Sequence, residues 1–408
     1  MRRAASPAAI AESRGWPGRR LPRPLWAGLA ALVVAIGIGR FLYTPLLPAM
    51  QAAGTIHPSS ALSNATAGAI ASTNYLGYLM GALTAGMIPL RSGRDRRRWV
   101  GVALWLGVCA TLAMGVASSL PAWFVLRGVS GLASGWAFVW VAALLMDWMP
   151  EAGHPNGNGW LFAGVGVGIA LTGLVTPGLV ALGGWRAGWW GMGLLAVPIV
   201  WWAMKGLPLV DRMPAAVPAT APGRPASFAF WGLVVAYALE GLGYVVMATF
   251  ITAFFTRATS AAAADASWVL VGLAATPSVA LWGHAARRWG VQRAVYAVYV
   301  IEGVGVLLPV FVGGLPAAGV ASVLFGGTFL GVMGLILILG RAASPQNGAR
   351  TVAQLTVAFG VGQLVGPAAA GWLTDRTHAF QPALLLSALV LLAAPAVLWI
   401  ARRPAGFR

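Results

Sequence analysis

Long apolar runs alternate with short polar gaps along almost the whole chain. A helix that crosses a bilayer needs about 20 predominantly apolar residues. The sequence contains twelve such stretches, centred near Ile36, Gly77, Gly107, Ala133, Ile169, Val197, Leu239, Ala274, Val304, Gly331, Gly360 and Leu391. The gaps leave no room for a soluble domain between the runs. The pattern predicts an all-α, multi-pass membrane protein with twelve transmembrane helices.

The composition agrees with a chain that is covered by lipid. Of its 408 residues, 59% are hydrophobic and only 9% are charged. A soluble fold of this length has too little polar surface in such a sequence to cover its apolar core.

The basic residues predict the orientation of the chain. Most of the 27 Lys and Arg residues fall at the amino terminus, at the carboxyl terminus and in every second gap, whereas the alternate gaps hold only Arg186, Arg257 and Arg376. Cations next to spans stay on the cytoplasmic side, so both termini are predicted to be cytoplasmic. The net charge of +18 is then explained by anionic membrane lipids and predicts no nucleic-acid partner. The use of Arg in place of Lys is typical of GC-rich bacterial genomes, so we expect a bacterial inner-membrane protein.

A Pro- and Ala-rich segment at residues 208–227 divides the spans six and six. Proline at this density disfavours helix and sheet, so the segment is predicted to be a cytoplasmic linker. The expected organisation is a basic amino-terminal arm (1–24), an N-terminal six-helix bundle (25–207), the linker, a C-terminal six-helix bundle (228–401) and a cytoplasmic tail (402–408).

The two halves also echo each other in sequence. Residues 37–40 (Gly-Ile-Gly-Arg) match residues 241–244 (Gly-Leu-Gly-Tyr) at a distance of half the chain. Glycines four residues apart, such as Gly164 and Gly168, are typical of helices that pack closely in lipid. Two pseudo-symmetric halves that face each other across a midplane site are the architecture of alternating-access transporters.

Four stretches resemble the YbfB/YjiJ-type branch of the major facilitator superfamily. They are residues 37–48 (Gly-Ile-Gly-Arg-Phe-Leu-Tyr-Thr-Pro-Leu-Leu-Pro), 74–81 (Asn-Tyr-Leu-Gly-Tyr-Leu-Met-Gly), 239–250, and 360–367 (Gly-Val-Gly-Gln-Leu-Val-Gly-Pro). The resemblance covers both halves. It implies a major facilitator fold and a secondary transporter of a small molecule, with a cavity lined by the first, fourth, seventh and tenth spans.

The motif that this superfamily carries between its second and third spans is only partly present. Its glycine and basic positions correspond to Gly86, Arg91, Gly93 and Arg94, which are therefore candidate conformational residues. Leu90 stands where the motif has Asp, so closure of the cytoplasmic side must use other contacts. Residues 173–184 only loosely approach the motif of drug and proton antiporters, which disfavours that function.

Glu240 is the candidate proton-coupling residue. It lies near the middle of the seventh span and shares a helical face with Tyr237 and Tyr244. A charged carboxyl is costly inside a bilayer, which suits a group that takes up and releases a proton. The alternative is a carboxyl held in a fixed hydrogen bond. Glu302 lies on the ninth span, which is peripheral in the resembled fold, and we expect a structural role for it.

Arg40 and Arg127 lie at similar depths in the first and fourth spans, and no acidic residue of the first half shares that depth. Two such guanidinium groups fit an organic anion. The alternative for each is a bond to headgroups or to backbone carbonyls. The remaining candidate substrate contacts are Tyr43, Asn74, Tyr75, Tyr237, Tyr244 and Gln363. For Asn74, Tyr75 and Gln363, a hydrogen bond between helices is an equal alternative.

The sequence shows neither a clustered nucleophile and base nor a metal-binding pattern, so we expect no enzyme, no cofactor and no metal. The predicted function is alternating-access transport of a small organic solute, coupled to protons, by a monomer in contact with lipids. The two arginines favour an anionic or carboxylate-bearing substrate. Efflux of apolar, drug-like compounds is the main alternative. A non-transporting membrane sensor or scaffold is a remote one.

Overall fold

The structure is a computed structural model that describes residues 22–53, 62–88, 90, 92–152, 158–210, 228–343 and 348–402. The regular structure in these segments is helical. The first half contains α2 (Arg23–Leu32), the π-helix η1 (Val33–Ile38), α3 (Gly39–Phe41), α4 (Tyr43–Ala52), α5 (Asn64–Ala85), α6 (Gly93–Val116), α7 (Leu120–Glu151) and α8 (Asn158–Gly206). The second half contains α9 (Phe228–Ala258), α10 (Ala261–Trp289), α11 (Val291–Phe311), α12 (Leu315–Ala343), α13 (Gly348–Thr377) and α14 (Gln381–Arg402).

The helices confirm an all-α membrane protein. Among the described residues, ten helices are long and apolar enough to cross a membrane. One of them, α8, has 49 residues and is interrupted by non-helical backbone at Gly183 and at Gly184, whose φ of 66° favours glycine. The 22-residue α5 covers the second predicted span but is not among the ten. The full count of twelve spans therefore stays a prediction.

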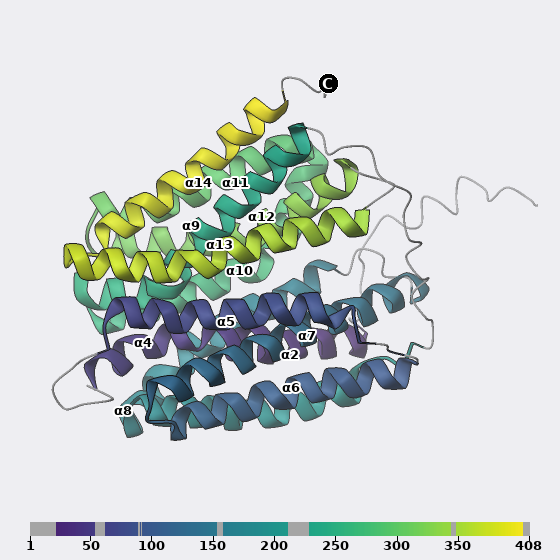
Figure 1. The fold of residues 1–408 in the computed structure, drawn as a ribbon, viewed down its shortest axis with the longest axis horizontal. Helices are drawn as coiled ribbons and strands as arrows, with labels where there is room; N and C mark the ends of the chain where they lie inside the picture. The colour runs from purple at the N-terminus through teal and green to yellow at the C-terminus, as the bar shows by residue number, and fades with distance from the viewer. Residues whose placement is uncertain are drawn as a thin grey trace, which may run out of the picture.

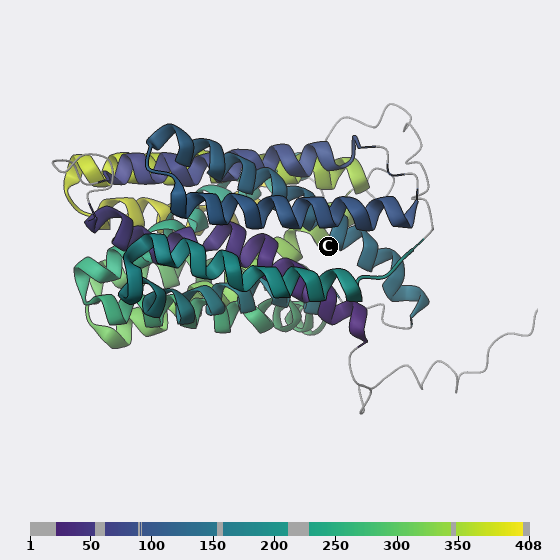
Figure 2. The same ribbon diagram turned by 90° about the horizontal axis from the view of Figure 1, so that it is seen from below.

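The two halves of the chain form two halves of the molecule (Figure 1). Helices α2 to α8 lie on one side, helices α9 to α14 lie on the other, and most run roughly parallel or antiparallel to one another (Figures 1 and 2). The halves meet where α5 packs along α13 and where α8 packs along α10. The predicted linker at 208–227 lies largely outside the described residues.

The first span is continuous but not a regular α-helix. Its π-helical turn, η1, comes directly before Arg40 on α3. At this turn Gly37 approaches α8 so closely that a Cβ on Gly37 would lie 2.4 Å from the Cα of Gly168. Single π-helical turns inside helices are frequent at functional sites.

Hydrogen bonds join the two halves at the end of the bundle where α4 ends and α5 begins, here called the α4–α5 end. The carboxylate of Asp375, on α13, accepts hydrogen bonds from the backbone N–H of Asn64 (3.0 Å), from the Asn64 side-chain amide (2.7 Å) and from the Ala65 N–H (2.7 Å). Asp375 thus binds the amino terminus of α5, where an anion is favoured by the helix dipole.

A second connection between the halves follows the sequence repeat. The hydroxyl of Thr44 on α4 donates to the carbonyl oxygen of Ala248 on α9 at 2.7 Å, across a separation of 204 positions. This is half of the 408-residue chain and the same offset that relates residues 37–40 to residues 241–244. Thr252 returns a hydrogen bond to the carbonyl oxygen of Thr44 at 2.5 Å. The contact therefore joins equivalent positions of the first and seventh predicted spans.

Candidate functional site

Arg40 lies between the two halves, and its guanidinium group lies over two aromatic rings. Its Cζ is 4.4 Å from the ring centre of Tyr75 and 4.4 Å from that of Tyr78, both on α5. The side chain is 7% exposed, and its Nε and Nη2 atoms have no hydrogen-bond acceptor among the described residues. Tyr244 of the second half lies close enough to interact electrostatically with it. The site therefore offers a buried cation with unused donors.

Arg127, on α7, uses its guanidinium differently. Its Nη1 donates to the carbonyl oxygen of Gly39 at 3.0 Å, and its Nη2 donates to that of Arg40 at 3.1 Å. The hydroxyl of Ser130 also donates to the Gly39 carbonyl, at 2.8 Å. These bonds place Arg127 at the depth of Arg40, and they tie α7 to the first span beside the π-helical turn.

Tyr43 and Asn74 also bind backbone carbonyls. The Tyr43 hydroxyl donates to Ala67 O at 3.0 Å, and its ring lies beneath Arg127, 5.1 Å from the Cζ. The Asn74 side-chain amide donates to the carbonyl oxygen of Arg127 at 2.9 Å. Tyr43 thus joins the first predicted span to the second, and Asn74 joins the second to the fourth, both beside Arg127.

A stack of aromatic rings faces Arg40 from the second half. Tyr237 stacks on Phe359 with ring centres 4.6 Å apart, and Tyr244 stacks on the same ring at 5.5 Å. The stack continues from Tyr244 to Phe329 at 5.8 Å and from Phe329 to Phe325 at 5.4 Å. It thus draws rings from α9, α12 and α13 into one wall.

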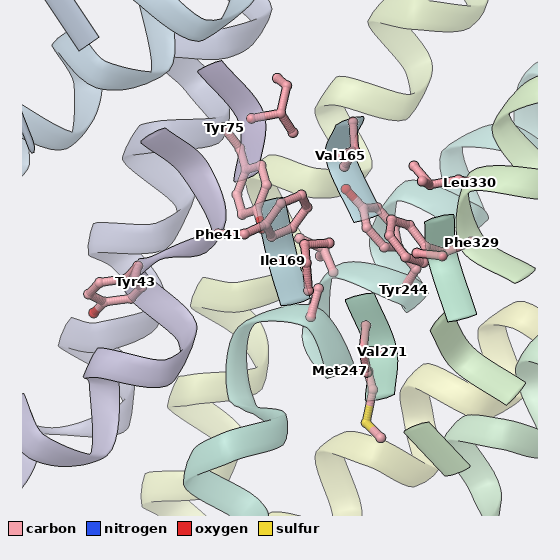
Figure 3. Close-up of a cluster of buried hydrophobic side chains, with 14 of the residues drawn as sticks. Phe41, Tyr43, Tyr75, Val165, Ile169, Tyr244, Met247, Val271, Phe329 and Leu330 are labelled. Atoms are coloured by element: carbon pink, nitrogen blue, oxygen red, sulfur yellow. The ribbon is translucent and has the colours of Figure 1, made fainter. Parts of the chain in front are cut away.

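The wall meets the first half in the buried cluster of Figure 3. Phe41 and Tyr75 project toward Ile169, and Tyr244 and Phe329 lie opposite them, whereas Tyr43 points away. Gln363 donates from its side-chain amide to the Tyr244 hydroxyl, while its own amide oxygen has no donor among the described residues.

Glu240 is fully buried, one helical turn from both Tyr237 and Tyr244 on α9. Its carboxyl group lies within hydrogen-bonding reach of the carboxyl group of Glu302, on α11. The structure thus brings together the proton-coupling candidate and a residue that the sequence led us to expect in a structural role.

The candidate conformational residues do not gather around this site. Gly93 begins α6, where a Cβ would lie 2.4 Å from the carbonyl oxygen of Val210. Arg94 is exposed, and the Cβ position of Gly86 has open space around it. Arg91 lies outside the described residues. Their role in conformational change stays a prediction.

Sequence reasoning missed several members of the site. Tyr78 follows Tyr75 and Asn74 at helical spacing of three and four residues, so it shares their face and its role was detectable. Phe329 and Phe359 carry no such signal, because an aromatic residue in an apolar span is equally compatible with facing lipid. Within the described residues, no group of three or more His, Cys, Asp or Glu is arranged to hold a metal ion.

Comparison with known proteins gives one family match that covers most of the chain. The model of the family described as "Uncharacterised MFS-type transporter YbfB" matches residues 32–399. A curated relative, the gallate transporter of Pseudomonas putida, is 30% identical over 146 residues, which make up 35% of this chain and 32% of that protein. The chain therefore matches about a third of that relative's length.

Solved structures show the same fold. The nucleoside transporter NupG superposes with a TM-score of 0.72 at 13% identity, over 93% of this chain and 99% of that chain. A bacterial homologue of the human lysosomal transporter Spinster, in an inward-facing and occupied conformation, gives 0.71 at 14% identity, over 95% and 98%. Its inward-facing, unoccupied form gives 0.66 at 17% identity, over 95% and 96%.

Proposed function

The chain belongs to the major facilitator superfamily, in the family of the uncharacterised MFS-type transporter YbfB, and from this premise we propose that it is a proton-coupled secondary transporter of a small organic anion. Transport proceeds by alternating access, as the two halves rock around the site at Arg40. Glu240 carries the coupled proton. Since the matched family and the similar structures are transporters, the protein is not an enzyme.

The observation that carries the proposal is the state of the Arg40 side chain. A guanidinium inside a membrane protein costs about 2.5 to 3.5 kcal/mol on insertion scales unless a partner or water compensates it. Two aromatic faces compensate part of this cost, at roughly 2 kcal/mol for a desolvated cation–π contact. The unused Nε and Nη2 donors are left for an incoming acceptor, and a carboxylate matches their geometry.

The surroundings of Arg40 favour an aromatic carboxylate. The stacked rings of Tyr237, Phe359, Tyr244 and Phe329 offer flat faces beside the cation. A substituted benzoate would stack on such faces while its carboxylate binds Arg40. The similarity to a gallate transporter supports this class, because gallate is a hydroxylated benzoate.

We assign different roles to the other candidates. Tyr75 and Tyr244 contact the substrate beside Arg40, and Tyr237 extends the aromatic wall. Gln363 positions the Tyr244 hydroxyl, to which it donates. Arg127, Tyr43 and Asn74 position the first span, because all three donate to backbone carbonyls.

The proposal places the protein in a bacterial inner membrane as a monomer surrounded by lipid, with both termini in the cytoplasm. The halves at 25–207 and 228–401 act as the two moving bundles, and residues 208–227 link them. The distribution of basic residues along the sequence supports this orientation.

Efflux of neutral aromatic compounds is the second candidate function, and the stacked wall is the observation that favours it. A neutral aromatic substrate would stack on these rings without binding to the Arg40 guanidinium group. The two candidates therefore differ in their dependence on Arg40.

A ligand-binding measurement on the purified protein tests the proposal. We expect benzoate and gallate to raise the unfolding temperature of the wild-type protein, and benzyl alcohol, which lacks the carboxylate, to leave it unchanged. Arg40→Ala should abolish the shift, whereas Tyr296→Phe, a change on α11 outside the site, should preserve it. Equal shifts with benzyl alcohol, or full shifts in Arg40→Ala, would contradict an anion site and favour the efflux alternative.

A further inference from the structure

Two acidic side chains meet inside the second half, far from the ends of the helices that carry them. Glu240 lies in the middle of α9 and Glu302 in the middle of α11, and both are 0% exposed. Tyr299, one turn before Glu302, donates a hydrogen bond to the carbonyl oxygen of Ala236, one turn before Glu240, so the two carboxyl groups lie at the same level of α9 and α11 and interact with each other. None of the four carboxyl oxygens receives a hydrogen bond from a donor group of the described residues. Among the described residues, each carboxyl group therefore has only the other as a hydrogen-bond partner.

The ionisable side chains beside the pair are phenols. Tyr237 and Tyr244 face Glu240 from the same helix, and Tyr299 faces both carboxyls from α11. The Tyr299 hydroxyl is already used, because it donates to the carbonyl oxygen of Ala236 at 3.0 Å. No phenol supplies a positive charge to the pair.

The other helices packed against α9 also bring no cation to the pair among the described residues. Helix α4 carries no charged residue. The charged and titratable residues of α10, α12, α13 and α14 lie toward the helix ends: Asp265, His284, Arg287, Arg288, Arg341, Arg350, Asp375, Arg376 and Arg402. On α11 itself, Arg293 lies in the first turn. The pair is thus surrounded by apolar and phenolic groups.

Chemistry restricts the charge that such a pair can carry. Two ionised carboxylates have acceptors only, so they cannot form a hydrogen bond with each other. One proton converts the pair into a donor and an acceptor, and like charges at this distance oppose the loss of that proton. A carboxyl pair in an apolar setting therefore holds one proton, which the two groups share.

We propose that Glu240 and Glu302 together form the proton site of the transporter, which assigns to Glu302 a role in coupling. This inference rests on the proposed function and extends its proton-binding residue to a pair. On release, the O–H bond of one carboxyl breaks, the proton passes to water, and the pair keeps an additional negative charge. Tyr244 lies next to Glu240 and also interacts with Arg40, so it connects the proton site to the substrate site.

Transport by variants in proteoliposomes tests the pair, with radiolabelled gallate as the probe. We expect Glu240→Gln and Glu302→Gln each to lose accumulation driven by a proton gradient, down to the level without a gradient, and to retain gallate counterflow. Counterflow in each variant should also lose its pH dependence. Glu302→Asp should restore part of the driven accumulation, and Asp265→Asn, a carboxyl-to-amide change elsewhere in this half, should behave as wild type.

The outcomes separate the two proposals. If Glu240→Gln loses driven accumulation while Glu302→Gln keeps it with a wild-type pH profile, the pair is refuted and proton coupling through Glu240 stands. If both variants accumulate gallate normally, proton coupling through Glu240 fails as well.

A spectroscopic measurement covers variants that transport poorly because they are destabilised. Infrared spectra of the wild-type protein at neutral pH should contain the carbonyl band of a protonated, buried carboxylic acid. Each Gln variant should change this band, and Asp265→Asn should not. A band that is absent from the wild type, or that persists unchanged in Glu302→Gln, would overturn the shared proton.

Discussion

Two arginines at the same depth have opposite uses in this molecule. The sequence places Arg40 and Arg127 together but does not distinguish them, because both lack an acidic neighbour in the first half. In the structure, Arg127 donates from both Nη atoms to backbone carbonyls and has only Nε without an acceptor, whereas Arg40 lies over two rings with Nε and Nη2 unused. The first arrangement stabilises the fold, and the second leaves a cation for a ligand.

This difference predicts opposite effects on the stability of the ligand-free protein. Arg127→Ala removes one hydrogen bond from the carbonyl of Arg40 and one from the carbonyl of Gly39, which keeps its bond from Ser130. Each lost hydrogen bond from a charged donor costs about 1.5 to 3 kcal/mol. Arg40→Ala removes a costly buried cation together with its cation–π contacts, and these two effects nearly offset each other. Thermal unfolding in detergent should therefore show a clear loss for Arg127→Ala and little change for Arg40→Ala. Equal losses would show that Arg40 is a structural residue.

At the scale of residues, the sequence was most informative about polar groups in apolar spans. Arg40, Glu240 and Gln363 stand out because charged and amide groups are rare and costly in lipid. The partner of Glu240 could not be found in this way, since the approach of α11 to α9 is a property of the tertiary structure. The same holds for Phe329 and Phe359 in the aromatic wall.

At the scale of elements, glycine sets how closely the helices approach. A Cβ on Gly168 would lie 2.6 Å from the Cα of Gly37 and 2.9 Å from the carbonyl oxygen of Val33. The four-residue glycine spacing in the sequence predicted a packing face on this helix but not its partner. In the structure that partner is the π-helical turn that precedes Arg40.

Adding one methyl group at this contact tests its importance. We expect Gly168→Ala to force η1 away from α8, to cost roughly 1 to 3 kcal/mol as an overpacked contact, and to weaken benzoate binding by displacing Arg40. Gly178→Ala is the matched control on the same helix, because no atom lies within 4 Å of its added Cβ. Thermal unfolding with and without benzoate measures both effects. Identical behaviour of the two variants would contradict the assigned contact.

The sequence predicted the existence of helices better than their exact form. Apolar length identifies spans because a bilayer requires each backbone polar group to be satisfied within its own segment. Helix α8 contains both spans predicted around Ile169 and Val197, and the chain is interrupted between them at Gly183 and Gly184. Helix α5 carries buried Asn64, Ser72 and Asn74, which explains why it is less apolar than its neighbours.

At the scale of the whole molecule, the six-plus-six division and the internal repeat predicted two facing halves. The resemblance to the YbfB-type branch is confirmed by the family match over residues 32–399. The repeat is visible as a contact, since Thr44 binds Ala248 at an offset of half the chain. The sequence also showed that the superfamily's Asp is replaced by Leu90, without indicating which contacts close the molecule instead. At the opposite end of α5 from Leu90, Asp375 joins α13 to the amino terminus of α5.

The central claim is that the two halves carry an organic anion across the membrane around Arg40, and counterflow in proteoliposomes tests it most directly. Vesicles that contain the wild-type protein and are loaded with unlabelled gallate should transiently accumulate radiolabelled gallate from outside, and vesicles with Arg40→Ala should not. Binding of gallate without any counterflow in the wild type would contradict transport and indicate a membrane sensor or scaffold.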